Sequence, residues 1–164
     1  MSSLFTYSPS EVTLVVGGYT ITGWEKISIS KNAPAFIPIR GIRGKNTRVR
    51  NTDTSVTLSV PLLQTSMGND VFSQIHMLDI ERGTGRLEIT LKDASGTGVF
   101  SSSEAYLMDY PVVAYSGSFE YRVWTIFAQS TNTYNVGGNG KVDNIFDSIL
   151  GAANKVVDKV SSFL

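Results

Sequence analysis

The sequence predicts a mainly β fold, an antiparallel β-sandwich or barrel with one short internal α-helix and a C-terminal amphipathic helix. Two observations favour this class. Runs with strand-like alternation outnumber helical runs, and they follow one another through short turns, which favours antiparallel pairing over a doubly wound parallel sheet. The length of 164 residues is enough for one domain with a sizeable core and too short for two comfortable ones.

The first third of the chain predicts paired strands followed by a long loop. Residues 11–16 and 19–22 are β-rich runs on either side of a Gly-Gly dipeptide, which suits a tight hairpin. Residues 24–30 alternate again. Residues 32–38 contain two prolines, which favours an edge strand or a loop. Residues 40–51 are polar, basic and interrupted by glycine, and we expect a long loop with ragged strand ends there.

The middle of the chain predicts a strand that runs into a helix. Apolar residues at every second position from Val56 to Leu62 indicate a strand with one face in the core. Ser66 is the predicted N-cap of the helix, because its hydroxyl can accept from a backbone N–H of the first turn. The helix is expected to end near residues 81–83. Its predicted apolar positions are Val71, Phe72, Ile75 and Leu78.

Three further strand runs follow the helix, at residues 85–92, 98–109 and 119–129, with a turn at 93–98. We therefore divide the chain into a β domain at 1–130, a Gly/Asn-rich linker at 131–141 and a C-terminal amphipathic helix at 142–164.

The C-terminal segment carries apolar residues three and four apart, with charged residues between them. Its own domain, an adjacent subunit, a surrounding sheath or a membrane surface are the possible docking partners. A membrane ranks last, because the polar face is mixed in sign. The residues expected to dock on a partner are Ile145, Phe146, Ile149, Leu150, Val156 and Val160.

Composition and residue inventory predict neither catalysis nor bound cofactors. The formal net charge is zero, so nothing global attracts the chain to nucleic acid or to an anionic membrane. No cysteine is present, which excludes disulfides and thiolate sites. His76 is the only histidine and is expected to be a partly exposed helix residue. We therefore predict no catalytic residue, no metal site and no cofactor. We read residues 93–96 as a plain turn, not a calcium loop, and 136–144 as a linker, not a phosphate loop.

The N-terminus and the hydropathy of the chain predict neither a signal peptide nor a membrane-spanning helix. The first twelve residues lack a basic region followed by an apolar run, so no signal peptide is expected. Nowhere do about eighteen uncharged apolar residues follow one another, so no spanning helix is expected. We expect a protein that stays in the cytosol until it is assembled.

Three segments carry a resemblance to a known family. They are GYTITGWEKISISKN from Gly18, LQTSMGND from Leu63, and AYLMDYPVV with EYRVWTIFA from Ala105 and Glu120. In this order, over roughly residues 14–128, they resemble the tail tube proteins of contractile-tailed bacteriophages. Where that family tends to be glycine-rich and acidic, this chain has the basic IRGIRGKNTRVRN, and it continues beyond residue 128. The family-like motif residues are Gln64, Thr65, Ser66, Asn69 and Asp70.

The resemblance implies a structural protein of the virion tail, assembled in the host cytoplasm. Family membership implies six-subunit rings whose sheets join edge to edge and which stack into a hollow conduit for the genome. The implied partners are other copies of the chain and the sheath, baseplate and tail terminator proteins. DNA is expected to pass without specific binding, and no membrane is involved.

The basic stretch has three readings: a contact between stacked rings, a solvated loop, or a DNA contact. The resemblance implies the first, with bidentate pairs to carboxylates of the next ring such as Asp70, Asp79, Glu81 or Glu104. A strongly basic lumen would bind phosphate and stall ejection, so we expect these side chains to point away from the channel. The contact residues are Arg40, Arg43, Lys45, Arg48 and Arg50.

Two alternatives stay open. One is the inner-tube subunit of a bacterial secretion or contractile injection particle. The other is a surface- or carbohydrate-binding β-sandwich module, whose aromatic side chains would stack on sugars. Its candidate residues are Trp24, Tyr106, Tyr110, Tyr115, Tyr121 and Trp124.

Overall fold

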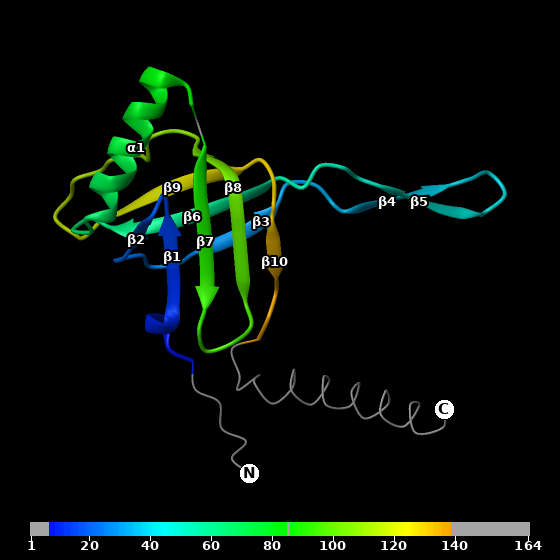
Figure 1. Ribbon diagram of the computed structural model, residues 1–164, viewed down its shortest axis with the longest axis horizontal. Coiled ribbons are helices and arrows are strands. Elements are labelled where there is room, and N and C mark those ends of the chain that lie inside the picture. Colours follow the sequence, from blue (N-terminus) through cyan, green and yellow to red (C-terminus); the bar gives the residue numbers. More distant parts are fainter. Residues whose placement is uncertain (1–6, 85, 139–164) are drawn as a thin grey trace, which may run out of the picture.

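The computed structural model describes residues 7–84 and 86–138. The predicted docking helix at 142–164, with Ile145, Phe146, Ile149, Leu150, Val156 and Val160, lies outside the described residues, as does the end of the predicted linker. The elements in chain order (Figure 1) are a 3-10 turn at Pro9–Glu11, β1 Val12–Val16, β2 Tyr19–Ile21, β3 Ser28–Lys31, β4 Phe36–Arg40, β5 Asn46–Arg50, β6 Val56–Leu63, α1 Gly68–Arg82, β7 Leu87–Asp93, β8 Val99–Leu107, β9 Tyr121–Ala128 and β10 Thr133–Asn135.

The strands form one eight-stranded sheet and a separate two-stranded ribbon. The order in the large sheet is β2-β1-β7-β8-β9-β6-β3, with β10 paired to β8, and the ribbon is β4-β5. Every strand pair is antiparallel. Figure 1 shows β1, β7 and β8 crossing over β3, β6 and β9, so the sheet folds back on itself. The predicted antiparallel β fold with one internal helix is therefore confirmed.

The core lies between the crossing layers and is built by alternate residues of β6 and β9. Val56, Leu58, Val60 and Leu62 are fully buried, and the residues between them are only partly covered. On β9, Trp124 and Ile126 are buried by the same alternation. Phe72 of α1 closes this core by an edge-to-face contact with Trp124, at 5.4 Å between ring centroids. The alternation predicted for residues 56–62 is thus confirmed.

The first hairpin forms where the sequence predicts it. Val16 pairs with Tyr19 across Gly17 and Gly18, and both glycines have positive φ, at 58° and 86°. A two-residue hairpin turn of this kind requires positive φ at both positions, which glycine adopts without strain.

The start of α1 differs from the prediction. Met67 stands at the N-cap, and no side chain caps the helix there. Ser66, the predicted N-cap, accepts a hydrogen bond from the Gly68 N–H at 3.1 Å and donates to the Thr22 carbonyl. Its hydroxyl therefore fixes the corner between β2 and α1. The predicted end is confirmed, because Gly83 closes the helix in the left-handed region with φ of 63°.

The faces of α1 also differ from the prediction. Gly68, Phe72 and His76, four residues apart, are the buried positions, whereas Leu78 is about half exposed at 49%. His76 was expected to be partly exposed, and that prediction was wrong: it is 6% exposed and packs edge-to-face on Tyr110 at 4.6 Å. His76 is buried by a tertiary contact, because the segment between β8 and β9, which contains Tyr110, crosses the helix at this point.

Two segments expected to be loops or linker contain strands. Residues 32–51, predicted as a loop with an edge strand, contain the hairpin β4–β5, which projects from the body as a long arm (Figure 1). Pro38 fits in β4 because only one side of each arm strand is paired. Within the predicted linker, Thr133–Asn135 forms β10 and pairs with β8.

Candidate assembly interface

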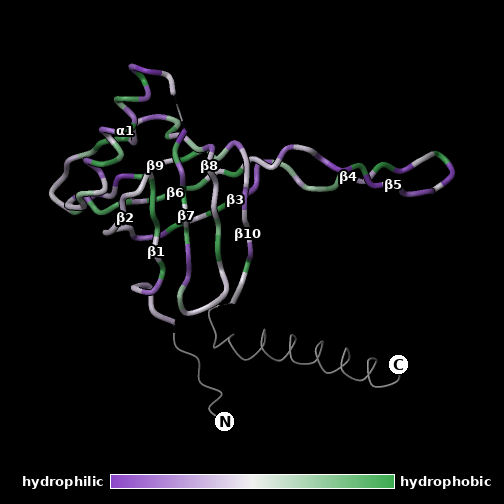
Figure 2. The backbone as a smooth tube through the Cα atoms, in the orientation of Figure 1, coloured by the Kyte–Doolittle hydropathy of each residue, from purple (hydrophilic) through white to green (hydrophobic). Residues whose placement is uncertain are grey.

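The projecting hairpin, residues 36–50, which we call the arm, exposes both of its strands. Every residue of β4 and β5 is solvent-exposed. The arm nevertheless carries large apolar side chains: Figure 2 shows hydrophobic stretches along it. An isolated two-stranded hairpin is at best marginally stable in water, so a partner surface is expected to complete it. The exposed apolar residues are Phe36, Ile37, Ile39, Ile42 and Val49.

The register of the arm gives it two chemically different faces. Directly opposed residues of an antiparallel pair lie on the same face. Ile37 opposes Val49 and Ile39 opposes Thr47, so one face is apolar. The other face combines Arg40, Arg48 and Arg50 with Phe36, on whose ring the Arg48 guanidinium stacks at 4.2 Å. A tight turn at the tip carries the remaining two basic residues, Arg43 and Lys45, and is closed by the Gly41 N–H donating to the Lys45 carbonyl at 2.9 Å.

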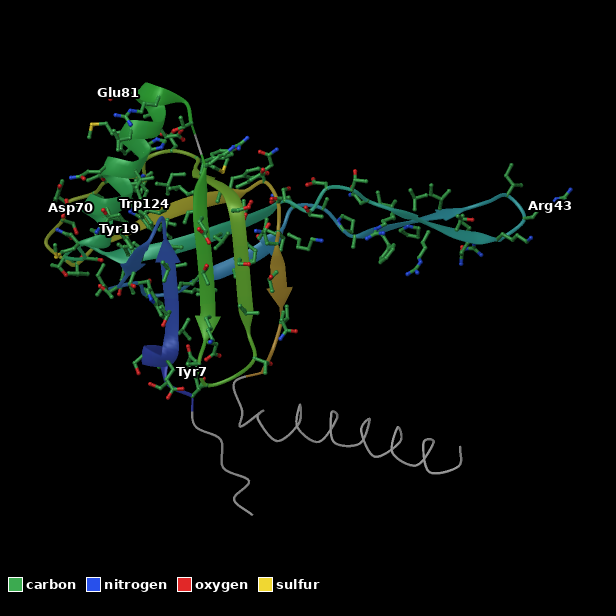
Figure 3. The ribbon with its side chains drawn as sticks, viewed as in Figure 1. Tyr7, Tyr19, Arg43, Asp70, Glu81 and Trp124 are labelled. Atoms are coloured by element: carbon green, nitrogen blue, oxygen red, sulfur yellow. The ribbon has the colours of Figure 1, made fainter. Side chains whose placement is uncertain are left out.

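The arm also separates the charge of the molecule. It holds five basic side chains and no acidic one, while the formal net charge of the chain is zero, so the remainder carries a net five negative charges. Figure 3 places Arg43 at the tip of the arm and Asp70 and Glu81 on the far side of the body, at the two ends of α1. The molecule is therefore electrically polar although it is neutral.

A second exposed surface lies at the opposite end of the body from the arm. The register of β6 with β9 defines the two ends: the arm joins the sheet next to the Val56–Ala128 pair, whereas the Leu63–Tyr121 pair lies beside the start of α1 and the segment between β8 and β9. Seven residue steps of strand separate these pairs, which is roughly 24 Å.

The segment between β8 and β9, residues 108–120, exposes many apolar side chains but is held in place. Arg122, itself only 7% exposed, donates to the Ala114 carbonyl at 3.2 Å and lies 5.1 Å from the Tyr115 ring. The Glu120 N–H donates to the Gln64 side-chain oxygen at 3.2 Å. This segment thus presents a fixed apolar surface. Its exposed apolar residues are Met108, Tyr110, Val112, Val113, Tyr115 and Phe119.

The family-like motif residues build this end of the body. Asn69 donates to the carbonyls of Leu63 and Ser66 at 2.8 and 3.1 Å and accepts from the Trp124 indole N–H at 2.9 Å. Together with the bond of Gln64 to the 108–120 segment and that of Ser66 to Thr22, just after β2, these contacts fix the β6–α1 corner. Thr65 and Asp70 are exposed beside it.

The structure brings the sequence-predicted residues into two groups at opposite ends. Arg40, Arg43, Lys45, Arg48 and Arg50 all lie on the arm, and the motif residues lie at the far corner. Sequence reasoning missed the two-faced arm and the apolar 108–120 surface. The alternation in FIPIR and RVR was the available signal for the first, and the run MDYPVVAY for the second.

Only some of the aromatic residues proposed for sugar binding lie on an exposed surface: Tyr110 and Tyr115 are 48% and 80% exposed on the 108–120 segment. Trp124 is buried at 2% exposure, Tyr106 packs against Phe127, and Tyr121 packs against Phe119. Trp24 instead lines a cavity of about 370 Å³ between the β3 side of the body and the β8–β10 edge. The six residues therefore do not form one stacking platform, and Tyr110 and Tyr115 belong to the apolar surface of the 108–120 segment.

The described residues offer no cluster of side chains suited to a metal ion. No group of three or more candidate ligand residues lies together among them. The turn at 93–96 is held by Asp93, whose carboxylate accepts from the Ser95 N–H and hydroxyl at 3.0 and 2.6 Å. Within the described part of the chain, no helix has the length and hydropathy needed to span a bilayer.

Comparison with known proteins gives one curated relative and several related folds. The chain is 33% identical over 148 residues to structural protein ORF10 of Pseudomonas phage KPP10, which covers 84% of this chain and 85% of the relative. No protein-family profile matches it. Its fold is similar to a chain of the sheath-tube complex of the PVC extracellular contractile injection system, with a TM-score of 0.55, 14% identity, and coverage of 83% of this chain and 93% of the other. It is also similar to the tube terminating cap of the anti-feeding prophage, with a TM-score of 0.50, 12% identity, and coverage of 82% and 95%.

Proposed function

Because this chain belongs to a family of tail-tube-like structural proteins of phages, we propose that it is the tube subunit itself, forming hexameric rings that stack into a hollow conduit for genome delivery. The curated relative is a structural protein of a phage, so the chain is a structural component of the particle and not an enzyme. We further propose that it assembles in the host cytoplasm and meets sheath, baseplate and terminator proteins in the virion tail.

The observation that carries this proposal is the arm. A fully exposed hairpin with one apolar and one basic face gains stability only when another surface covers it. The remainder of the same molecule is acidic by the same five charges. A second copy therefore supplies a complementary surface, and the contact is heterologous, because two different surfaces of the chain meet. Contacts of this kind repeat into rings or open stacks.

Ring closure has a separate candidate contact in the sheet edges. β2 and β3 are the two ends of the large sheet, so each has one unpaired side. An unpaired strand edge is a template for pairing with another chain. Joining β2 of one copy to β3 of the next closes a ring without using the arm, which leaves the arm for contact between rings.

DNA is expected to pass through the conduit without being held. The basic arm would bind phosphate if it faced the channel. We propose that its arginines instead face carboxylates of a neighbouring copy, where bidentate pairing is strongest.

The inner tube of a contractile injection particle is the second candidate, favoured by the fold likeness to a chain of the PVC sheath-tube complex. The two candidates share the same subunit architecture and differ in cargo. Particles purified from the producing cells distinguish them: a tube attached to a DNA-filled capsid supports the phage tail, and a tube without a capsid supports the injection particle.

The proposal is tested by negative-stain electron microscopy and mass photometry of the purified protein over a range of concentrations. Rings and hollow stacks are expected. The matched control is Ile37→Ser with Ile39→Ser on the arm, which leaves the core intact and is expected to give rings without stacks. A wild-type protein that stays monomeric at every concentration, with or without tubes added as seeds, would contradict the proposal.

The C-terminal segment remains a proposed docking element that reaches another chain. Its test is a truncation after Gly138, since a cut after Ser130 would delete β10. Loss of assembly with an unchanged melting temperature supports docking on a neighbour. Normal assembly of the truncated protein contradicts it.

A further inference from the structure

We propose that the arm of one copy docks on the opposite end of the next copy, on a surface that we call the arm receptor. The inference rests on the proposed stacking and adds the surface that accepts the arm. The receptor consists of Met67 and the first turn of α1 together with the segment between β8 and β9. Its exposed residues are Met67, Asp70, Asp109, Val112, Val113 and Tyr115.

The first argument is position. The arm leaves the body at the Val56–Ala128 end of the β6–β9 pair, and the receptor lies beside the Leu63–Tyr121 end. Figure 3 agrees, since Arg43 and Asp70 lie at opposite extremes of the long axis. Copies related by a shift along that axis therefore bring the arm of one to the receptor of the next. Each arm strand has five residues, so the paired part of the arm extends roughly 13 Å beyond its base.

The second argument is apolar complementarity. The arm exposes Ile37, Ile39 and Val49 on one face. The receptor exposes Val112 at 87%, Tyr115 at 80% and Met67 at 78%. Both are large apolar side chains that a monomer leaves in water, and burying one set against the other is favourable.

The third argument is charge. The basic face and the tip of the arm carry all five of its cations. On the receptor, Asp70 is exposed and the Asp109 side chain is 87% exposed, with its carboxylate 3.9 Å from His76 Nε2. Arg122 also lies under the receptor, buried and bonded to the Ala114 carbonyl, with its guanidinium 5.1 Å from the Tyr115 ring, so its positive charge opposes an arginine placed directly over that ring. Opposite charges therefore meet where the basic face and the tip of the arm reach Asp70 and Asp109.

The fourth argument is that the receptor is already shaped. Tyr110 packs on His76 of α1, and Ser116 bonds to the Ser118 carbonyl at 3.1 Å and the Glu120 carboxylate at 2.7 Å. These contacts anchor the segment at Tyr110 and between Ser116 and Glu120 before any partner arrives. A preformed surface loses little conformational freedom on docking.

The outward face of α1 is the competing acceptor. It exposes Met77 and Ile80 together with Glu81. It lies along the side of the helix toward its end, away from the end of β6 that faces the next copy. We therefore place the arm on the receptor, and the experiment below includes this face as a separate outcome.

The test uses the absence of cysteine in the chain, which makes every introduced thiol unique. Arg43→Cys and Val113→Cys proteins, made separately and mixed under assembly conditions with mild oxidant, are expected to form a mixed disulfide, identified by mass spectrometry of the linked peptides. Because each copy carries one thiol, the link joins two copies. Arg43→Cys mixed with Ile80→Cys on the outward helix face, or with Ala94→Cys on the β7–β8 turn, is expected to link at least tenfold less.

A reciprocal charge exchange provides the second readout. Arg43→Glu with Lys45→Glu reverses the arm tip, and Asp70→Lys with Asp109→Lys reverses the receptor. Each double variant alone is expected to lose stacking, and a mixture of the two is expected to regain it, because every arm then finds an oppositely charged receptor. Unchanged melting curves show that each variant is folded.

The outcomes separate this inference from the proposed function. Tubes that form while Arg43→Cys links to Ile80→Cys, or while the charge exchange gives no rescue, overturn the receptor and leave the tube subunit standing. A wild-type protein that forms neither tubes nor links overturns both.

Discussion

The arm and the β6–β9 pair are built from the same kind of alternating strand, but they end in opposite environments. In β6, every second residue is completely buried. In β4 and β5, every residue is exposed, although the register sorts the side chains into an apolar and a basic face in the same way. An alternating pattern therefore predicts that one face of a strand is buried. It does not tell whether the residues that bury it belong to the same chain or to another.

The largest contrast is expected in the free energy of unfolding. Leu58→Ala in β6 removes a fully buried side chain and is expected to destabilise the monomer by about 2–5 kcal/mol. Ile39→Ala on the arm, a matched loss of apolar volume, is expected to change it by less than about 0.5 kcal/mol. Urea unfolding of both variants at low protein concentration measures the difference. Equal destabilisation would show that the arm belongs to the folded core.

Two glycines with positive φ sharpen the same comparison. A Cβ on Gly23 would lie 2.8 Å from the Ser66 Cβ at the β2–α1 corner, whereas a Cβ on Gly44 in the arm tip meets nothing within 4 Å, at similar φ of 76° and 82°. Gly23→Ala is expected to cost about 2–4 kcal/mol, from strain and overpacking together. Gly44→Ala introduces only the backbone strain of a positive φ, without a steric clash, and is expected to leave the melting temperature of the body unchanged. Calorimetry of the two variants isolates the steric part.

The reverse contrast is expected in assembly. Ile37→Ser with Ile39→Ser removes two side chains from the apolar face of the arm, and burial of each is worth about 1.5–3 kcal/mol. The concentration needed for stacking is therefore expected to rise about a hundredfold or more, with no change in monomer unfolding. Light scattering against concentration measures it. Stacking at the wild-type concentration would remove the apolar face from the contact.

A smaller effect is expected at the corner that supports the receptor. Asn69→Ala leaves the Trp124 indole N–H without its partner and removes two bonds to carbonyls. The expected loss of stability is about 1–3 kcal/mol. Trp fluorescence during urea unfolding measures it, and Thr65→Ala, a neighbouring exposed position, is the control expected to have no effect.

The smallest effect is expected at the base of the arm, where hydrogen bonds from Ser55 hold the pKa of Asp53 below its usual value. A carboxyl whose pKa is lower in the folded protein contributes stability above its unfolded pKa of about 3.9 and loses it as the pH falls through the lower folded value. The turn between Asp53 and Ser55 is thus expected to be unaffected from pH 8 to 5 and to loosen only in strong acid. NMR titration of the Asp53 carboxyl measures the lowered pKa. Asp53→Asn is expected to abolish the loosening of the turn in acid.

The sequence was sufficient for the parts of the fold that depend on local pattern. The hairpin at Gly17-Gly18, the alternation of β6 and the glycine end of α1 were all predicted, because each follows from backbone geometry within a few residues. The predictions of Ser66 as the N-cap and of His76 as partly exposed were wrong. Both features are decided by residues far away in sequence, Thr22 for Ser66 and Tyr110 for His76. The predicted basic cluster exists on the arm, but its division into faces needed the register of β4 with β5.

The exposed position of the arm also makes it accessible to proteases. Its five basic side chains are the residues after which trypsin-like enzymes cut, and they stand on a two-stranded ribbon outside the folded body. A subunit clipped there keeps its core, because none of the buried apolar residues lies on the arm. It would remain soluble and folded, yet be unable to extend a stack. The rate at which the arm becomes resistant to trypsin therefore measures how quickly new subunits are incorporated.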